Sequence, residues 1–95
     1  MTTYAIALIE ISDRNEYAAY EKGFVDIFKQ YQGRVLAVEE APVVKEGTWP
    51  YTRTVLAEFP SQSEFDRWYH SDAYQALAKH RFAASRASIA LLRSV

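Results

Sequence analysis

The residues with the widest chemical repertoire in this sequence are aromatic, and three of them stand close together. Trp68, Tyr69 and Tyr74 flank the pair Ser71-Asp72 in the second half of the chain. Their rings can line a hydrophobic pocket while the phenol groups orient a ligand. Core packing explains the same residues equally well, because large aromatic side chains are usually buried. The cluster therefore predicts either the wall of a pocket or part of the core.

Two arginines are candidates for binding negative charge. Arg34 and Arg81 each carry a planar fork of N–H donors that fits a carboxylate or an enolate. Arg34 is structural instead if it pairs with Glu58. Arg81 follows Tyr74 by seven residues, on or beside an apolar stripe, where an unpaired charge is costly to bury. It either extends to solvent or faces a polar cavity.

Two histidines are the default candidates for proton transfer, because histidine changes charge near neutral pH. His70 and His80 are ten residues apart, so they do not form the adjacent-turn pair of a helical metal site. An exposed histidine on a helix is usually only solvated. The sequence contains no cysteine, which excludes thiolate nucleophiles and cysteine-ligated metals. We expect neither a metal nor a cofactor.

The composition narrows the class of protein. Of the 95 residues, 49% are apolar and 15% aromatic, which is high for one small domain and indicates that some apolar surface is covered by a second copy. The net charge is −1 and no basic run appears, so nucleic-acid binding is not expected. No signal peptide or membrane span is visible, and a cytoplasmic protein is expected.

The elements that must position these side chains follow a strand–helix–strand–strand–helix–strand order within a single domain, residues 1–95. Hydrophobic periodicity and capping signals place Ser12-Asp13 and Ser61 at helix starts and a break or second cap at Ser71-Asp72. They place Gln32-Gly33 at the end of the first helix, with Gly33 in the left-handed conformation. The expected strands are 4–11, 34–41, 51–59 and 87–93, and the expected helices are 13–32 and a broken one from 61 to 82.

Strands 34–41 and 51–59 should form an antiparallel hairpin whose register follows from charge pairs. Arg34 is expected opposite Glu58, and Glu39 opposite Arg53. The first strand is apolar on both alternating sets of residues. We therefore predict an α+β, ferredoxin-like fold: a four-stranded antiparallel sheet, two helices on one face, and a homodimer formed through the other face.

The first helix carries Tyr17 and Tyr20 on its apolar side, and one of these phenols can point into a cavity. A core tyrosine with its hydroxyl at the rim is the alternative.

The chain resembles the proteins grouped as domain of unknown function 1330, within the dimeric α/β-barrel superfamily. The resemblance covers nearly the whole length and rests on short strings of residues. These are Tyr20, Gly33-Arg34, Glu46-Gly47, Glu58-Phe59-Pro60-Ser61, and Trp68-Tyr69-His70-Ser71 followed by Tyr74 and Arg81. Two departures concern the usual Gly-Gly-Arg step, which is Gln32-Gly33-Arg34 here, and the end of the last strand.

The resemblance implies two sheets packed face to face, helices outside, and a cavity between helices and sheet in each subunit. It favours Tyr20 over Tyr17 as a cavity residue. Relatives of this shape include cofactor-independent monooxygenases, lactone isomerases and haem enzymes.

Three functions fit the sequence. The first is a cofactor-independent, monooxygenase-like or isomerase-like enzyme for a small apolar or aromatic metabolite, with Tyr20, Arg34, Trp68, Tyr69, Tyr74 and Arg81 as ligand-binding residues and His80, Arg81 and Tyr20 as catalytic candidates. The second is a non-catalytic ligand-binding or stress-related dimer. The third is a structural dimerisation module without a pocket.

Overall fold

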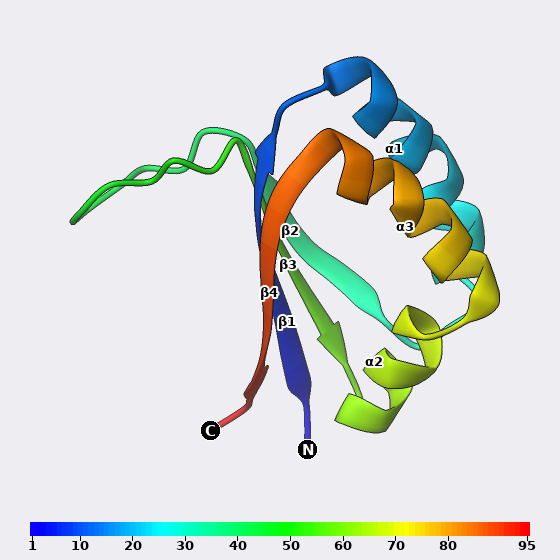
Figure 1. The fold of residues 1–95 in the computed structure, drawn as a ribbon. Coiled ribbons are helices and arrows are strands. Elements are labelled where there is room, and N and C mark those ends of the chain that lie inside the picture. The colour runs from blue at the N-terminus through cyan, green and yellow to red at the C-terminus, as the bar shows by residue number, and fades with distance from the viewer.

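A computed structural model describes residues 1–95 as one antiparallel sheet with all helices on one face (Figure 1). The sheet order is β2-β3-β1-β4. The elements are β1 (Thr3–Ile11), α1 (Arg14–Phe28), β2 (Arg34–Glu39), β3 (Arg53–Phe59), α2 (Gln62–Tyr69), α3 (Asp72–Ala84) and β4 (Ser85–Arg93). The predicted ferredoxin-like order is confirmed, with the second helical region divided in two. None of the helices combines the length and the apolar character that crossing a membrane requires.

All three helices begin at the expected type of residue. The carboxylate of Asp13 accepts the backbone N–H of Glu16, and the hydroxyl of Ser61 accepts that of Glu64. At the predicted break, the hydroxyl of Ser71 accepts the backbone N–H of Tyr74 and starts α3 in a new direction. This cap lies where α2 and α3 meet, and Tyr74 next to it is buried.

The first helix ends earlier than predicted, and the role assigned to Gly33 is wrong. Helix α1 stops at Phe28, with Lys29 at its C-cap, and Gly47 is the only residue with a positive φ. Gly33 is needed for close packing instead. A Cβ built on it would lie 2.6 Å from Cζ of Phe28 and 2.8 Å from Cζ of Phe59. Because Gly33 has no side chain, the rings of Phe28 and Phe59 can pack against its backbone.

The hairpin register is half as predicted. Arg34 lies opposite Glu58, and their side chains form an ion pair with Nη2 and Oε1 2.6 Å apart. The prediction of Glu39 opposite Arg53 is wrong, because an irregularity between Val35 and Ala37 inserts one extra residue into β2. Glu39 therefore lies opposite Thr54.

The two faces of the sheet have different surroundings. Alternate residues of the central strands, including Ala5, Ile9 and Ala57, are buried beneath the helices. The residues between them, Ile6 opposite Leu56 among others, point to the side that no helix covers. The connection between β2 and β3 extends away from the helices on that same side (Figure 1).

Candidate functional site

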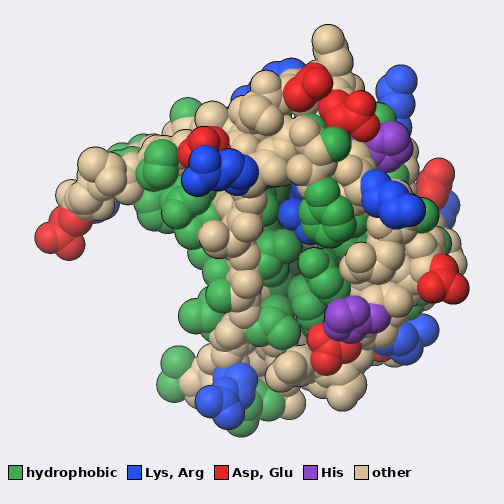
Figure 2. All heavy atoms as spheres, viewed as in Figure 1, with side chains coloured by type: hydrophobic (Ala, Val, Ile, Leu, Met, Phe, Trp, Pro, Cys, Tyr) green, Lys and Arg blue, Asp and Glu red, His purple; other side chains and the backbone are tan.

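A cavity of about 420 Å³ lies between the helices and the sheet. Its floor is made by small side chains on the central strands, notably Ala5, Ala7 and Ala57, while the helices contribute rings to its walls. Small residues on the sheet leave a gap that the aromatic side chains do not fill. Seventeen of the twenty lining residues are hydrophobic, so the space is suited to an apolar molecule. In Figure 2 the hollow opens between the sheet and the helices, with green side chains along it.

Two tyrosines meet inside the molecule at this cavity. Tyr20 of α1 and Tyr74 of α3 are both buried, and their hydroxyl oxygens lie 2.7 Å apart in a hydrogen bond. Burial, together with the neighbouring phenol of Tyr74, holds the pKa of Tyr20 far above its usual range. Tyr20 therefore stays protonated at neutral pH and acts in the site as a neutral hydrogen-bonding group.

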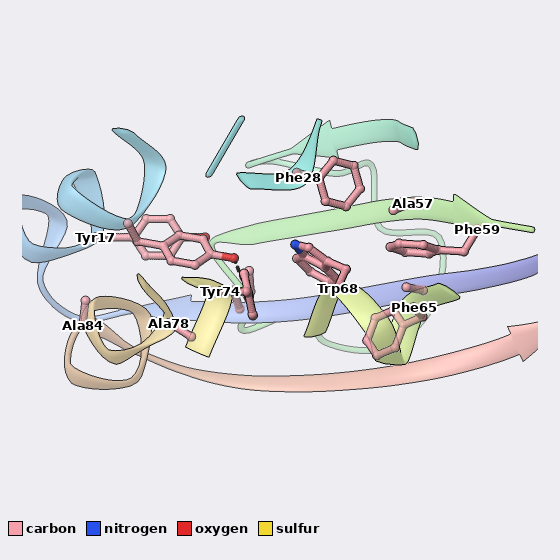
Figure 3. Packing of buried hydrophobic residues seen from close by; sticks show 12 residues of the cluster. Tyr17, Phe28, Ala57, Phe59, Phe65, Trp68, Tyr74, Ala78 and Ala84 are labelled. Carbon is pink, nitrogen blue, oxygen red and sulfur yellow. Dashed lines mark hydrogen bonds between the residues drawn. The ribbon is translucent and has the colours of Figure 1, made fainter. Parts of the chain in front are cut away.

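Trp68 of α2 forms the wall next to this pair. Its ring centroid lies 4.3 Å from that of Tyr74, and the ring also stacks on Phe59. The indole Nε1 is fully buried and has no hydrogen-bond partner. Figure 3 shows this nitrogen on the edge of the ring nearer to Tyr74 than to Phe65. A buried N–H without an acceptor is unusual in a folded protein.

Arg81 of α3 supplies the positive charge of the site. The residue is 5% exposed, and none of the ion pairs of the molecule includes it. Its Nε is buried without a partner, and the guanidinium carbon lies 5.8 Å from the centre of the Tyr20 ring. Burial lowers the pKa of Arg81, but the neighbouring phenols of Tyr74 and Tyr20 outweigh burial and leave it raised. The guanidinium is therefore charged at any ordinary pH.

Two charged residues at the cavity were not among the predicted site residues. Glu21 and Arg53 line it, and their side chains lie 3.4 Å apart. Arg53 also contacts Glu40 at 3.2 Å and lies 5.8 Å from the centre of the Tyr17 ring. In Figure 2 basic atoms are visible within the green-lined hollow, and the lining contains Arg53 and Arg81 as its basic residues. Strand alternation would have placed Arg53 on the helix-facing side with Ala57.

Burial also raises the pKa of Tyr17, against the opposing effect of Arg53. Tyr17 lines the cavity alongside Tyr20, so both phenols of α1 that the sequence singled out reach the site.

The structure brings together four of the six predicted ligand-binding residues at the main cavity: Tyr20, Trp68, Tyr74 and Arg81. Tyr69 packs on Phe65 with ring centroids 5.4 Å apart and lines a second, neighbouring hollow. Arg34 is exposed and paired with Glu58, outside both hollows.

The histidines lie away from the cavity. His80 is half-exposed, and its Nδ1 lies 2.5 Å from the carboxylate of Glu16, so the pair links α3 to α1 at the surface. His70 caps the end of α2 and is exposed. No group of three or more histidine, aspartate or glutamate side chains is arranged to hold a metal ion.

Solved structures of other proteins share this fold. A protein of unknown function from Rhodopseudomonas palustris, RPA0582, matches with a TM-score of 0.84 at 20% identity, covering 99% of this chain and 82% of that one. SnoaB, a cofactor-independent oxygenase from Streptomyces nogalater, matches with a TM-score of 0.73 at 10% identity, covering 99% and 93%. A dimeric ferredoxin-like protein of unknown function from Bacteroides fragilis matches with a TM-score of 0.70 at 10% identity, covering 98% and 96%.

These identities are too low to carry an activity from one protein to another, so the likeness concerns the fold. No curated protein matches the sequence. The model of the family described as Domain of unknown function (DUF1330) matches residues 2–95, and the chain therefore belongs to that family.

Proposed function

We propose that this chain binds a small apolar or aromatic molecule in the cavity between its helices and its sheet. The observation that carries the proposal is a cavity of about 420 Å³ whose lining residues include Trp68 and Arg81, each with a buried side-chain nitrogen that has no hydrogen-bond partner. A volume of this size is typical of pockets for small ligands. An unsatisfied buried donor costs on the order of 1–3 kcal/mol, and a ligand carrying an acceptor removes that cost.

The test is a ligand screen combined with a variant that fills the cavity. Ala7 lies between Val55 and Ile89 on the helix-facing side of the sheet and lines the cavity. Apolar phenols and aromatic acids should raise the melting temperature of the wild-type protein, since a ligand specific for the folded state stabilises it. The variant Ala7→Leu should fold and lose this effect, whereas Ala76→Leu, at an exposed position of α3, should keep it.

A solid interior would give a different result. Leucine at position 7 would then be overpacked and would lower stability by about 1–3 kcal/mol. That loss, together with no stabilisation of the wild-type protein by any compound, would refute the proposal.

A second candidate function is turnover of the bound molecule without a cofactor. The permanent charge of Arg81 beside an apolar space favours it, because a cation there stabilises the enolate formed when a carbon acid loses a proton. Glu21 is the only carboxylate in the lining and is the proposed proton acceptor. His80 is held on the outer side by Glu16, so this scheme gives it no direct role.

The reaction to measure is hydrogen exchange in the ketone 2-tetralone. The carboxylate of Glu21 takes a proton from the carbon beside the carbonyl, Arg81 binds the enolate oxygen, and a deuteron from D₂O replaces the proton. NMR should detect exchange above the buffer rate for the wild-type protein and a large loss for both Glu21→Gln and Arg81→Gln. If the wild-type protein exchanges hydrogen no faster than buffer, the proposed turnover is refuted and ligand binding remains the proposed function.

We further infer that the chain works as a homodimer through the sheet face that no helix covers. Several solved neighbours, including those from Bacteroides fragilis and Thermobifida fusca, are described as dimeric, which supports the inference. The face carries Tyr4, Ile6 and Leu8 of β1 beside Leu56, an apolar surface of the kind that monomers seldom leave in water.

Sedimentation equilibrium tests this inference. The wild-type protein should sediment as a dimer, the variant Ile6→Lys as a monomer, and the control Ala76→Lys, at an exposed position of α3, as a dimer. A wild-type monomer at micromolar concentration would contradict this inference.

A further inference from the structure

Two hollows meet at Arg81. The main cavity lies beneath the helices, and a second hollow of about 350 Å³ lies between the end of α3 and β4. Arg81 and Ile89 line both of them. Arg81 therefore lies where the two hollows adjoin.

The surroundings of the cavity differ from one edge of the sheet to the other. Toward β2 the lining includes Val25 of α1 and Val35 and Val38 of β2, all apolar and all partly in contact with solvent. The lining also contains Glu21 and Arg53, whose opposite charges form an ion pair, so Arg81 is its unpaired charge. On the β4 side the second hollow is lined by Arg81 together with the polar residues Tyr69 and Ser85, and the hydroxyl of Ser85 donates to the backbone carbonyl of Arg81. An elongated molecule that fits this space would be apolar over most of its length and polar at one end.

Arg81 determines the sign of that polar end. A buried charge is normally balanced by an ion pair, but no ion pair of the molecule includes Arg81. The ring centres of Phe82 and Tyr20 lie 5.0 and 5.8 Å from its guanidinium carbon. Nε of Arg81 and Nε1 of Trp68 are both donors that cannot accept a hydrogen bond. Their complement is an oxygen that accepts, and the charge of Arg81 favours one that is negative.

We propose that the ligand class of this site is an amphipathic anion, with an apolar or aromatic body in the main cavity and a carboxylate, enolate or phenolate oxygen on Arg81. This inference rests on the proposed function, because it requires that the cavity binds a ligand. It adds the charge of the ligand and the direction in which it lies.

The experiment compares two probes of the same shape, 2-naphthoate and its neutral carboxamide, 2-naphthamide. Isothermal titration calorimetry with the wild-type protein should give a preference for the anion of about tenfold or more, as expected for a charge-assisted hydrogen bond. Arg81→Gln should remove this preference while retaining the amide. Arg34→Gln, which removes an exposed guanidinium outside the cavity, should leave both affinities unchanged.

The outcomes separate the two proposals. Equal affinities of the wild-type protein for acid and amide would overturn the anion and leave the binding function standing. A preference that survives in Arg81→Gln would overturn the assignment to Arg81. Binding of neither probe would refute both. If Arg81→Gln does not fold, the comparison of acid with amide in the wild-type protein still tests the charge of the ligand. The variant Arg81→Lys then tests the assignment to Arg81, because it keeps the charge and should retain most of the preference for the anion.

Discussion

The hydroxyl oxygens of Tyr20 and Tyr74 lie 2.7 Å apart, which joins α1 to α3 by a hydrogen bond between residues 54 positions apart in the chain. Both side chains are buried, so neither phenol can exchange this partner for bulk water. The contact holds the two long helices over the cavity and aligns two of its polar groups. It therefore contributes both to the stability of the fold and to the shape of the site.

Replacing both tyrosines by phenylalanine should cost less than the sum of the two single replacements. Tyr20→Phe and Tyr74→Phe each leave the other hydroxyl buried without a partner, at a cost of about 1–3 kcal/mol in the free energy of unfolding. The double variant should lose less than the sum of the two. Urea unfolding of the four proteins gives the coupling energy, and strict additivity would show that the hydrogen bond contributes nothing.

The protein should lose stability at alkaline pH. The pKa of Tyr20 is raised in the folded state by burial, so the folded protein holds this proton at pH values where the unfolded chain releases it. The contribution is complete below the tyrosine pKa of the unfolded chain, about 10, and falls above it by about 1.4 kcal/mol per pH unit for one group. Tyr17 adds to the loss in the same direction.

Urea unfolding at pH 8, 10 and 11 should therefore show a steeper loss of stability in the wild-type protein than in Tyr20→Phe. Parallel losses in the two proteins would mean that Tyr20 ionises in the folded state.

Gly33→Ala should destabilise the protein by about 1–3 kcal/mol, because the new methyl group has to displace aromatic rings. The rings are those of Phe28 and Phe59, which pack against the backbone of Gly33. The control is Gly47→Asn, at a position with φ of 80° and no atom near the absent Cβ. Asparagine tolerates that conformation, so its effect on the melting temperature should be small. Equal effects of the two variants would exclude the packing argument.

Arg34→Ala should have little effect on stability. Although Arg34 and Glu58 form an ion pair, the arginine side chain is 72% exposed. Exposed pairs contribute roughly 0–1 kcal/mol because water and salt screen them. Chemical denaturation at low and high salt measures this contribution, and a loss above about 2 kcal/mol would assign Arg34 a role that its exposure does not explain.

The sequence was sufficient to predict the order of the elements and the opposition of Arg34 and Glu58. It also predicted helix caps at Ser12-Asp13, Ser61 and Ser71-Asp72, and the structure shows them at Asp13, Ser61 and Ser71. These features are local, or depend on one pair of strands with a strong hydrophobic pattern. The extra residue near Leu36 was not predictable, because a bulge depends on how the whole hairpin twists. The bulge changed the residue opposite Glu39 from Arg53 to Thr54, and the spacing of charged residues in the sequence does not indicate this shift.

The candidate site was predicted only in part, for a similar reason. The aromatic residues and Arg81 were found from their spacing, but the spacing did not distinguish packing from a cavity. A cavity is indicated by the small size of Ala5, Ala7 and Ala57 on the helix-facing side of the sheet. This indication can be used only when it is known which side of the sheet faces the helices. The exclusion of His80 from the cavity followed from its contact with Glu16, 64 residues away.

The most direct test of the central claim, that the cavity binds a small molecule, uses the two indole N–H signals of the protein. Trp68 lines the cavity with its N–H unpaired, whereas the indole of Trp49 donates to Thr54 outside it. The variant Trp49→Phe assigns the two signals in a ¹H–¹⁵N correlation spectrum. On titration with 2-naphthoate, the account predicts that the Trp68 signal moves to saturation while the Trp49 signal stays in place. A stationary Trp68 signal at saturating probe would contradict it.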